Sequence, residues 1–237
     1  MNRGDETTPK PQALHKTHKV AFALLKEHLP EDSLVLDAGC GEGAFSQRLL
    51  SANYRLVALD IFPQRFKLKS VPLVQSDLNS SLPFPDATFD SVIAIEVLEH
   101  LYNWHTFFSE SCRILKPNGL LLVSLPNILN LSSRLKFLFC GYPSLYSRTR
   151  LLSDQSRLHV SLIPAPFLLN TAERIGFSLI RIAGDKLRRS SIILFPLFPF
   201  TFIITRLLFP DSYDPLTFKP FLLFSRTLLA LFKKLSD

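Results

Sequence analysis

Cysteine is scarce in this chain of 237 residues, which contains only Cys40, Cys112 and Cys140. The three cysteines lie far apart, and they form neither a C-x-x-C pair nor an even-numbered framework. This pattern argues against a disulfide-stabilised secreted domain and favours reduced thiols. The first 20 residues are polar and contain no apolar core of a secretory signal, so we expect a cytoplasmic protein.

Long apolar runs that could cross a membrane are lacking as well. A C-terminal stretch rich in phenylalanine and proline, Ser190–Thr205, contains 16 uncharged residues. A membrane-spanning helix needs about 20 apolar residues, and Pro196 and Pro199 interrupt this stretch. We therefore predict no clean transmembrane helix.

Acidic residues are outnumbered, because 27 lysines and arginines face 20 aspartates and glutamates, which gives a net charge of +7. Such a charge suits nucleic acid, an acidic substrate or an anionic membrane surface. Arg65, Lys67 and Lys69 lack interleaved aromatic residues, so we expect a solvated face there and no nucleic-acid partner. With 47% apolar and 20% charged residues, the chain can bury the core of one α/β domain with an appendage.

Three of the eight glycines lie in one short stretch, Leu34–Phe45, which reads LVLDAGCGEGAF. Its apolar start is typical of a strand buried on both faces of a parallel sheet. Gly39, Gly41 and Gly43 then permit positive φ and close approach of a ligand, and a helical pattern begins at Ala44. A strand, a glycine turn and a helix N-terminus in this order predict a nucleotide-sized site at the carboxyl end of a sheet.

The ligand of this turn is expected to carry a ribose but no phosphate. The spacing is G-x-G-x-G, and Glu42 places an anion at the mouth of the helix, where a pyrophosphate would otherwise bind. Asp60 follows a second predicted strand, Tyr54–Leu59, and lies 23 residues after Asp37, in a position to accept hydrogen bonds from a ribose diol. Taken singly, a glycine-rich structural turn and a loop acid stay open as alternatives.

Four segments of the chain resemble class I S-adenosylmethionine-dependent methyltransferases of the group that includes the ubiquinone-type O-methyltransferases. They read LDAGCGEG, VALDIF, SDLNSSLPFPDATFDSVIAIEVLEHL and RILKPNGLLLVSLPN, and they cover about residues 34–126 in the order and spacing of that family. The resemblance implies a Rossmann-like, doubly wound α/β fold with a mostly parallel seven-stranded sheet and helices on both faces. It also implies that S-adenosyl-L-methionine is the cofactor.

The positions that match the family's cofactor-binding residues lie at the ends of predicted strands. They are Asp37, Gly39, Cys40, Gly41, Asp60, Ile61, Asp77, Leu78 and Glu96. The resemblance implies that Asp37 orients the glycine turn or the methionine amino group. It also places Asp77 where the family reads the adenine amino group, with an ordinary loop acid as the alternative. Cys40 has no partner base for nucleophilic work, so we interpret it as a small packing residue.

Glu96, Glu99 and His100 form an E-x-x-E-H segment after the fourth predicted strand. On a helical turn, residues three and four apart share a face, so Glu96 can lie beside Glu99 and His100. Methyl transfer needs mainly positioning, and a base helps if the acceptor is a hydroxyl. We expect His100 to be the base and Glu96 to line the pocket. His159 is a further candidate, because family members often carry a histidine between lid and last helix; a structural histidine is the alternative.

A divalent metal ion is a second possible use of the same segment. Two carboxylates and an imidazole could hold a hard cation that acidifies an acceptor hydroxyl. In quinone-pathway relatives the similar segment is associated with metal and acceptor binding. Similar segments also occur in relatives with no known metal, so we assign no metal ion to this site.

The chain divides into a flexible polar tail, residues 1–12, a methyltransferase domain, residues 13–185, and a hydrophobic C-terminal segment, residues 186–237. A substrate lid is expected at about residues 128–161, and His18 is interpreted as solvated. The domain's predicted helices are 13–29, 104–115 and 164–175, and its later predicted strands are 71–75, 91–95, 120–125 and 177–183.

The C-terminal segment combines apolar with basic residues. Residues 220–235 predict an amphipathic helix with Arg226 and Lys233 on its polar side. Because an apolar face with a basic flank is typical of a membrane-interface helix, we expect peripheral membrane contact through residues 190–235, at the inner face of the membrane. Alternatively the segment covers the domain or pairs in a dimer, with the seventh strand in Phe221–Ser225. The oligomeric state is left unassigned.

Together these features predict a methyltransferase that acts at oxygen on a small or lipid-linked acceptor at the membrane surface. One alternative is a soluble methyltransferase for a small metabolite, and another is a non-catalytic S-adenosylmethionine-binding module that regulates a partner. A nucleic-acid methyltransferase is disfavoured, because no N-P-P-Y or D-P-P-Y tetrapeptide follows the fourth predicted strand.

Overall fold

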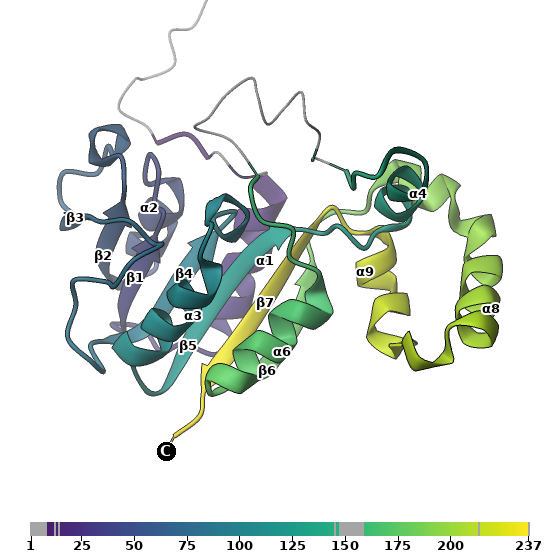
Figure 1. The fold of residues 1–237 in the computed structure, drawn as a ribbon. Helices are drawn as coiled ribbons and strands as arrows, with labels where there is room; N and C mark the ends of the chain where they lie inside the picture. Colours follow the sequence, from purple (N-terminus) through teal and green to yellow (C-terminus); the bar gives the residue numbers. More distant parts are fainter. Residues whose placement is uncertain are drawn as a thin grey trace, which may run out of the picture.

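A twisted sheet of seven strands lies at the centre of the molecule (Figure 1). A computed structural model describes residues 9–11, 13, 15–144, 146, 159–212 and 214–236, so most of the predicted tail and residues 145 and 147–158 of the predicted lid lie outside the described residues. The strands are β1 (Leu34–Ala38), β2 (Arg55–Asp60), β3 (Leu73–Gln75), β4 (Phe89–Ile95), β5 (Leu115–Pro126), β6 (Phe177–Gly184) and β7 (Thr227–Lys234).

The strand order is β3-β2-β1-β4-β5-β7-β6, and β7 alone runs antiparallel to its neighbours. This confirms the predicted doubly wound, mostly parallel sheet. The order reverses at β1 and β4, and in such sheets the crevice at the carboxyl ends of those strands binds ligands. The sheet therefore directs attention to the loops after β1, β2 and β4.

Helices cover both faces of the sheet, with α3 and α6 in front of it in Figure 1 and α1 behind. The described helices are α1 (His15–Lys26), α2 (Ala44–Leu50), α3 (Trp104–Ile114), α4 (Leu131–Cys140), α6 (Ala165–Ile175), α7 (Arg189–Ile193), α8 (Phe198–Leu208) and α9 (Pro220–Phe224), with short 3-10 helices η1 (Pro63–Arg65), η2 (Leu98–His100), η4 (Phe195–Leu197), η5 (Pro210–Ser212) and η6 (Pro215–Phe218). The predicted helices before β1, before β5 and before β6 are thus confirmed, with ends that differ by a few residues.

Side chains of the central strands alternate between two hydrophobic cores. Along β7, Leu228, Ala230 and Phe232 join the core under α3 and α6, whereas Leu229 and Leu231 join the core under α1 and α2. A strand that is buried on both faces must be apolar at successive positions, which explains the unbroken run LLALF.

The helix predicted for residues 220–235 is wrong. The described structure has the short helix α9 there, followed by β7, which pairs with β5 and β6. The predicted C-terminal segment therefore supplies the seventh strand, which begins two residues after the alternative position Phe221–Ser225. The rest of that segment is an insertion between β6 and β7. His18 is likewise not solvated: it is buried, with its ring edge-on to Phe45 at 5.2 Å between centroids.

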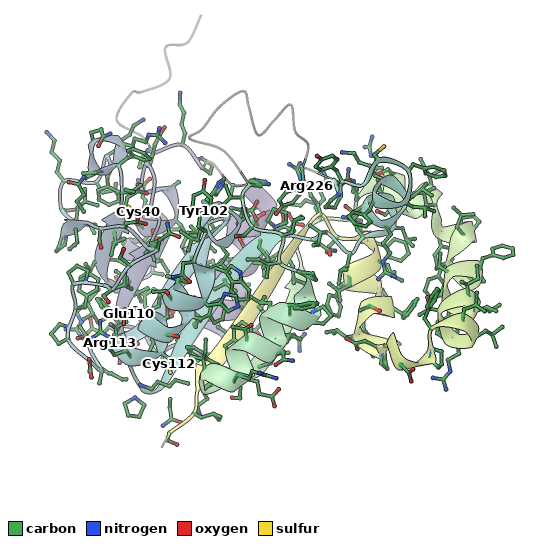
Figure 2. All side chains as sticks on the ribbon, viewed as in Figure 1. Cys40, Tyr102, Glu110, Cys112, Arg113 and Arg226 are labelled. Atoms are coloured by element: carbon green, nitrogen blue, oxygen red, sulfur yellow. The ribbon has the colours of Figure 1, made fainter. Side chains whose placement is uncertain are left out.

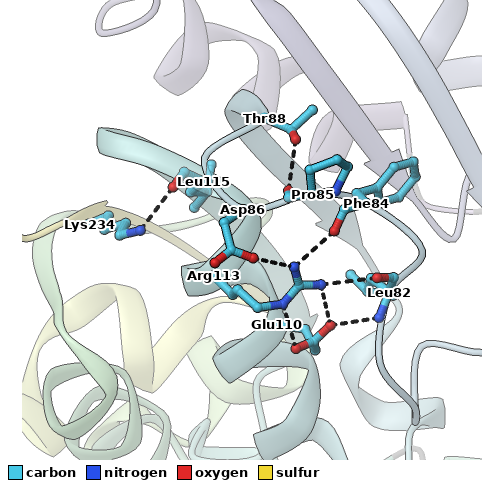
Figure 3. Close-up of polar contacts among 9 residues, drawn as sticks. All are labelled: Leu82, Phe84, Pro85, Asp86, Thr88, Glu110, Arg113, Leu115 and Lys234. Atoms are coloured by element: carbon cyan, nitrogen blue, oxygen red, sulfur yellow. Dashed lines mark hydrogen bonds and ion pairs between the residues drawn. The ribbon is translucent and has the colours of Figure 1, made fainter.

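The loop that leads into β4 is fixed to α3 by Arg113 (Figure 3). Its guanidinium donates to the carbonyl oxygens of Phe84 and Leu82 at 2.8 and 3.0 Å and pairs with Asp86 and Glu110, each at 2.7 Å. Glu96 follows the carboxyl end of β4, and this anchor lies at the opposite end of the strand. The contacts of Arg113 therefore stabilise the register of β4 in the sheet.

The insertion between β6 and β7 packs against α4. Ser191 of α7 donates to Asn130 Oδ1 at 3.2 Å, and Arg134 of α4 hydrogen-bonds the carbonyl oxygen of Thr217 while its guanidinium lies 5.4 Å from the ring centre of Phe218. Figure 1 shows α4, α8 and α9 together on one side of the sheet, away from β3. Together α4 and the insertion form a unit that we call the appendage, residues 131–140 and 186–224.

Candidate active site

The glycine turn after β1 lies against the end of β2. Gly39 and Cys40 each donate a backbone hydrogen bond to the carbonyl oxygen of Leu59, at 2.8 and 3.1 Å. Gly39, Gly41 and Gly43 all have positive φ, at 75°, 55° and 93°, a region that glycine occupies without the strain of a side chain. The turn thus brings its backbone to the sheet edge in a conformation that depends on glycine.

Two of these glycines also leave no space for a side chain. A Cβ on Gly39 would lie 2.5 Å from Cγ2 of Val97, and one on Gly43 would lie 2.8 Å from the ring of Phe66. Val97 follows Glu96 at the end of β4. The glycine turn and the E-x-x-E-H segment are therefore in direct contact, as expected if they line one site.

Asp60 holds the end of the turn through both of its carboxylate oxygens. Oδ2 accepts from the backbone N–H of Gly41 and Oδ1 from that of Phe62, both at 2.8 Å. Each oxygen retains a second lone pair for a ribose hydroxyl. Ile61 and Phe62 beside it are exposed, at 47% and 40%, and offer an apolar surface of the kind that an adenine ring covers.

Glu42 is the one acid inside the glycine turn, and its charge is paired. Its carboxylate lies 2.8 Å from Nζ of Lys67 and also accepts from the backbone N–H of Lys10 at 3.0 Å. The hydrogen bond from Lys67 lowers the pKa of Glu42. The anion at the helix mouth therefore has its own partner within the protein.

Asp77 and Leu78 follow β3 at the same edge. Oδ1 of Asp77 accepts from the backbone and side-chain N–H groups of Asn79, both at 2.9 Å, which fixes the carboxylate. Leu78 is buried in the core under α3. Their assignment to the adenine end of the site stays a prediction.

Asp37 is buried at the end of β1 and accepts a hydrogen bond from Ser46 Oγ of α2 at 2.5 Å. Burial raises the pKa of Asp37 to about 6, and the nearby charge of Asp60 contributes in the same direction. A carboxylate kept in this position despite the cost of burial is suited to a cationic ligand group, such as the amino group of methionine.

Replacement of Asp37 by asparagine should stabilise the fold in a pH-dependent way. The carboxyl group binds its proton more tightly in the folded state, so wild-type stability decreases as pH rises from about 4 to about 6 and then levels off. Asp37→Asn should therefore match the wild type near pH 4 and exceed it by up to about 3 kcal/mol above pH 6.

Urea unfolding at several pH values measures this difference, and exposed Asp86→Asn is the matched control. A gain that is equal at all pH values would contradict a raised pKa of Asp37. The same variant should bind S-adenosylhomocysteine more weakly at pH 8.

Cys40 is buried inside the turn, and burial raises the pKa of its thiol far above the ordinary value. A thiol in this state is a poor nucleophile. The chemistry of the site therefore has to come from the carboxyl groups and imidazoles that follow β4.

Glu96 occupies a strained position at the carboxyl end of β4, with φ of 55°. Its backbone N–H donates to Ser124 Oγ of β5 at 3.0 Å, and that hydroxyl donates to Glu96 Oε1 at 3.3 Å. Burial, followed by the negative charge of Asp185, raises the pKa of Glu96 to about 7. Positive φ in a glutamate is uncommon and is often retained at functional sites.

Asp185, directly after β6, is a site residue that the sequence analysis missed. Its carboxylate accepts from Thr17 Oγ1 of α1 at 3.0 Å and from the backbone N–H of Thr227 at 2.9 Å. An acid after a strand was a usable signal, but the carboxyl end of β6 lies at the same edge of the sheet as Glu96 because β7 is antiparallel to both β5 and β6.

Glu99 is buried in η2, and neither of its carboxyl oxygens has a hydrogen-bond partner among the described residues. Burial, and then the charge of Glu96, raises the pKa of Glu99 well above its usual range. Its backbone carbonyl accepts from the N–H groups of Val160 and Ser161 at 2.7 and 3.1 Å. This segment thereby ties the end of the predicted lid to the site.

The imidazoles of His100 and His159 lie together, with ring centroids 5.0 Å apart. Tyr146 packs edge-on to His159 at 5.3 Å and donates its hydroxyl to the carbonyl oxygen of Ser161 at 2.7 Å. Ligand atoms of Glu99, His100 and His159 lie within 4.8 Å of one another, so these three residues could hold a metal ion, whereas the sequence suggests Glu96, Glu99 and His100 as possible ligands and leaves the site without an assigned metal.

The predicted site residues thus fall into two adjoining groups. The glycine turn, Asp37, Asp60 and Ile61 form one group, and the second is formed by Glu96, Glu99, His100 and His159. Val97 joins them through its contact with Gly39. The fold and this arrangement define an α/β domain with a glycine turn beside an acid–imidazole cluster at the carboxyl edge of the sheet.

Comparisons with known proteins agree with this description. Residues 36–123 match the family model described as "Methyltransferase domain". A "probable S-adenosylmethionine-dependent methyltransferase" of Mycolicibacterium smegmatis is 34% identical over 122 residues, which are 49% of this chain and 47% of that protein. A ubiquinone biosynthesis O-methyltransferase of Methylocella silvestris is 30% identical over 141 residues, or 48% and 55% of the two chains.

The chain thus spans about half the length of these two curated relatives. The crystal structure of a SAM-dependent methyltransferase from Archaeoglobus fulgidus, at 18% identity, superposes with a TM-score of 0.61 and covers 92% of this chain and 94% of that one. Residues 36–123 therefore form a methyltransferase domain, and the chain is similar to S-adenosylmethionine-dependent methyltransferases in the sequence of this domain and in its overall fold.

Proposed function

We propose that the protein transfers the methyl group of S-adenosylmethionine to an oxygen atom of a small or lipid-linked acceptor at a membrane surface. The observation that carries this proposal is the acid–imidazole cluster after β4, in contact with the glycine turn through Val97 and Gly39. Carbon and nitrogen nucleophiles of many acceptors need less help from a base, whereas a hydroxyl must lose its proton.

The residues of the glycine turn fit the cofactor. Gly39 and Gly43 let the turn pack directly against Val97 and Phe66, and within this proposal Asp60 binds the ribose diol and Asp37 binds the methionine amino group. When bound, S-adenosylmethionine supplies an electrophilic methyl group on a sulfonium sulfur. Alignment of the acceptor oxygen with that methyl group accounts for most of the rate.

Within this proposal His100 accepts the proton of the acceptor hydroxyl, and Glu96 lines the acceptor pocket. His159, at the end of the lid, approaches His100 from the other side, and its ring is held against Tyr146. No metal ion is assigned a part in the reaction, although Glu99, His100 and His159 could provide ligands for one.

The acceptor is proposed to be small or carried by a lipid, because apolar side chains are exposed on the appendage next to the site. The net charge of +7 is compatible with an anionic membrane at the cytoplasmic side. Within the part of the chain that the structure describes, no helix is long and apolar enough to cross a membrane.

Incubation of the purified protein with methyl-labelled S-adenosylmethionine and fractionated cell extract tests the proposal. Label should enter the organic-solvent fraction in a base-stable form, as expected of a methyl ether, and Asp60→Ala should abolish it. Label only in water-soluble products would favour the soluble-metabolite enzyme. Binding of S-adenosylhomocysteine without any transfer would favour a regulatory module.

A further inference from the structure

We propose that the outward face of α8, together with the exposed end of α4, docks on the surface of an anionic lipid bilayer. The inference deepens the proposed function, on which it rests for its biological purpose, by naming the surface that meets the membrane. Its physical basis is independent of methyl transfer, since it depends on apolar and basic groups that lie outside the active site.

Helix α8 is apolar on two opposite sides. One side faces the rest of the appendage and is partly buried. It is formed by residues at the spacing i, i+3, i+4, i+7, which are Phe198, Thr201, Phe202 and Thr205. The outward side repeats that spacing with exposed large side chains. These are Phe200, Ile203, Ile204, Leu207 and Leu208.

A cluster of phenylalanines fixes the orientation of α8. Phe198 and Phe202 both contact the ring of Phe218, at 6.1 and 5.4 Å between centroids, and Phe195 lies 5.6 Å from Phe224 of α9. Because the inner side is packed by these rings, the outward side cannot turn inward without loss of the cluster. In Figure 2 some of the side chains of α8 project outward, away from the sheet.

Exposed apolar groups are concentrated in the appendage. Of the 22 large apolar side chains that are exposed among the described residues, 11 lie between Leu187 and Phe209. A further group, Phe137, Leu138 and Phe139, lies at the end of α4, which packs against α7. Such a concentration of exposed apolar side chains indicates a surface that is covered by a partner when the protein functions.

The basic residues around these exposed apolar side chains indicate which kind of partner binds there. Residues 186–210 contain four basic residues and no acid, and α4 contains Arg134 and Lys136 and no acid. Arg206 lies on the flank of the outward side of α8 and is exposed. An apolar stripe that carries basic but no acidic groups is complementary to the headgroups and acyl boundary of an anionic bilayer.

The length of α8 favours a position in the plane of the bilayer. Its 11 residues extend about 16 Å, whereas the hydrocarbon core is about 30 Å thick. The appendage is also joined to the sheet beside the active site, because Asp185 and Thr227, which flank the insertion, are hydrogen-bonded to each other near Glu96. Docking through α8 would thus hold the site close to lipid-borne acceptors.

Sedimentation of the full chain with vesicles tests the inference. Binding is expected to vesicles of phosphatidylcholine with phosphatidylglycerol and to be weaker with phosphatidylcholine alone. Leu207→Ser with Leu208→Ser should reduce partitioning by at least about tenfold, since two large side chains no longer enter the interface. Phe167→Ser with Leu179→Ser, which removes two exposed apolar groups outside the appendage, should leave partitioning unchanged.

Separate substitutions test the remaining parts of the surface. Leu138→Ser with Phe139→Ser should also weaken binding, and Arg206→Glu should weaken it chiefly on vesicles that contain phosphatidylglycerol. An equal loss in Leu207→Ser with Leu208→Ser and in the control pair Phe167→Ser with Leu179→Ser, or no binding to either vesicle, would overturn the inference. Self-association of the wild type that Leu207→Ser with Leu208→Ser abolishes, without vesicle binding, would overturn it in favour of a second copy as the partner.

Thermal unfolding of each variant confirms that the fold is intact. Binding of S-adenosylhomocysteine and methyl transfer to a water-dispersed acceptor are measured in parallel. Loss of vesicle binding with these activities retained would implicate the docking surface alone. Intact docking with no methyl transfer would instead count against the proposed function.

Discussion

Substitution of Asp60 by alanine should weaken the binding of S-adenosylhomocysteine by about two orders of magnitude or more. A ribose diol would lose two hydrogen bonds to a charged acceptor, each worth about 1.5–3 kcal/mol. The same carboxylate accepts from Gly41 and Phe62, so its removal also takes away one of the three hydrogen bonds that hold the glycine turn to β2. Titration calorimetry measures the loss directly.

Two variants make the Asp60 result interpretable. Asp86→Ala removes an exposed carboxylate that pairs with Arg113 outside the site and should leave the dissociation constant unchanged. Asp60→Asn keeps one acceptor oxygen and should give an intermediate affinity. An Asp60→Ala protein that binds as tightly as the wild type would remove the basis for placing the ribose at the end of β2.

The first half of the fold could be predicted because its signals are local. Strand β1, the glycines after it and Asp60 follow one another within 27 residues, from Leu34 to Asp60. Apolar runs without alternation indicated parallel strands buried on both faces, and the glycines required a turn. The structure confirms the buried parallel strand that these signals predicted, since β1 pairs in parallel with β2 and β4.

The C-terminal half could not be predicted by the same means. In residues 220–235, apolar residues recur at helical spacing, yet the run Leu228–Phe232 equally fits a strand with two buried faces. The segment forms a strand rather than a helix because it lies between β5 and β6, and only a strand can fill that position in the sheet. Burial of His18 against Phe45 likewise depends on where α1 docks, which no local pattern states.

The composition of the site was only partly predictable for a related reason. Glu96, Glu99 and His100 lie within five residues of one another and could be recognised as one motif in the sequence. His159 was a candidate only through the family resemblance, because it approaches them from the far end of the lid. Ser124 of the neighbouring strand β5 contacts Glu96, and Asp185, which follows β6 at the same edge of the sheet, raises its pKa. Their contribution follows from sheet topology, so it becomes visible only when β5, β6 and β7 are placed.

The acid–imidazole cluster leads to the second large expected effect. Replacement of His100 by alanine should lower the rate of methyl transfer by about two to four orders of magnitude, the usual contribution of a general base. Binding of S-adenosylhomocysteine should stay within about twofold, because His100 is not among the residues assigned to the cofactor. Single-turnover assays with labelled S-adenosylmethionine measure the rate, and calorimetry measures the binding.

Two histidine variants separate a base from a merely structural role. His105→Ala, at an exposed position on α3, should have no effect on either measurement. His159→Ala should reduce the rate less than His100→Ala, because His159 acts through its contact with His100 and Tyr146. A greater loss at His159 would move the base to the end of the lid, and an unchanged rate in both variants would mean that the acceptor reaches the site already deprotonated.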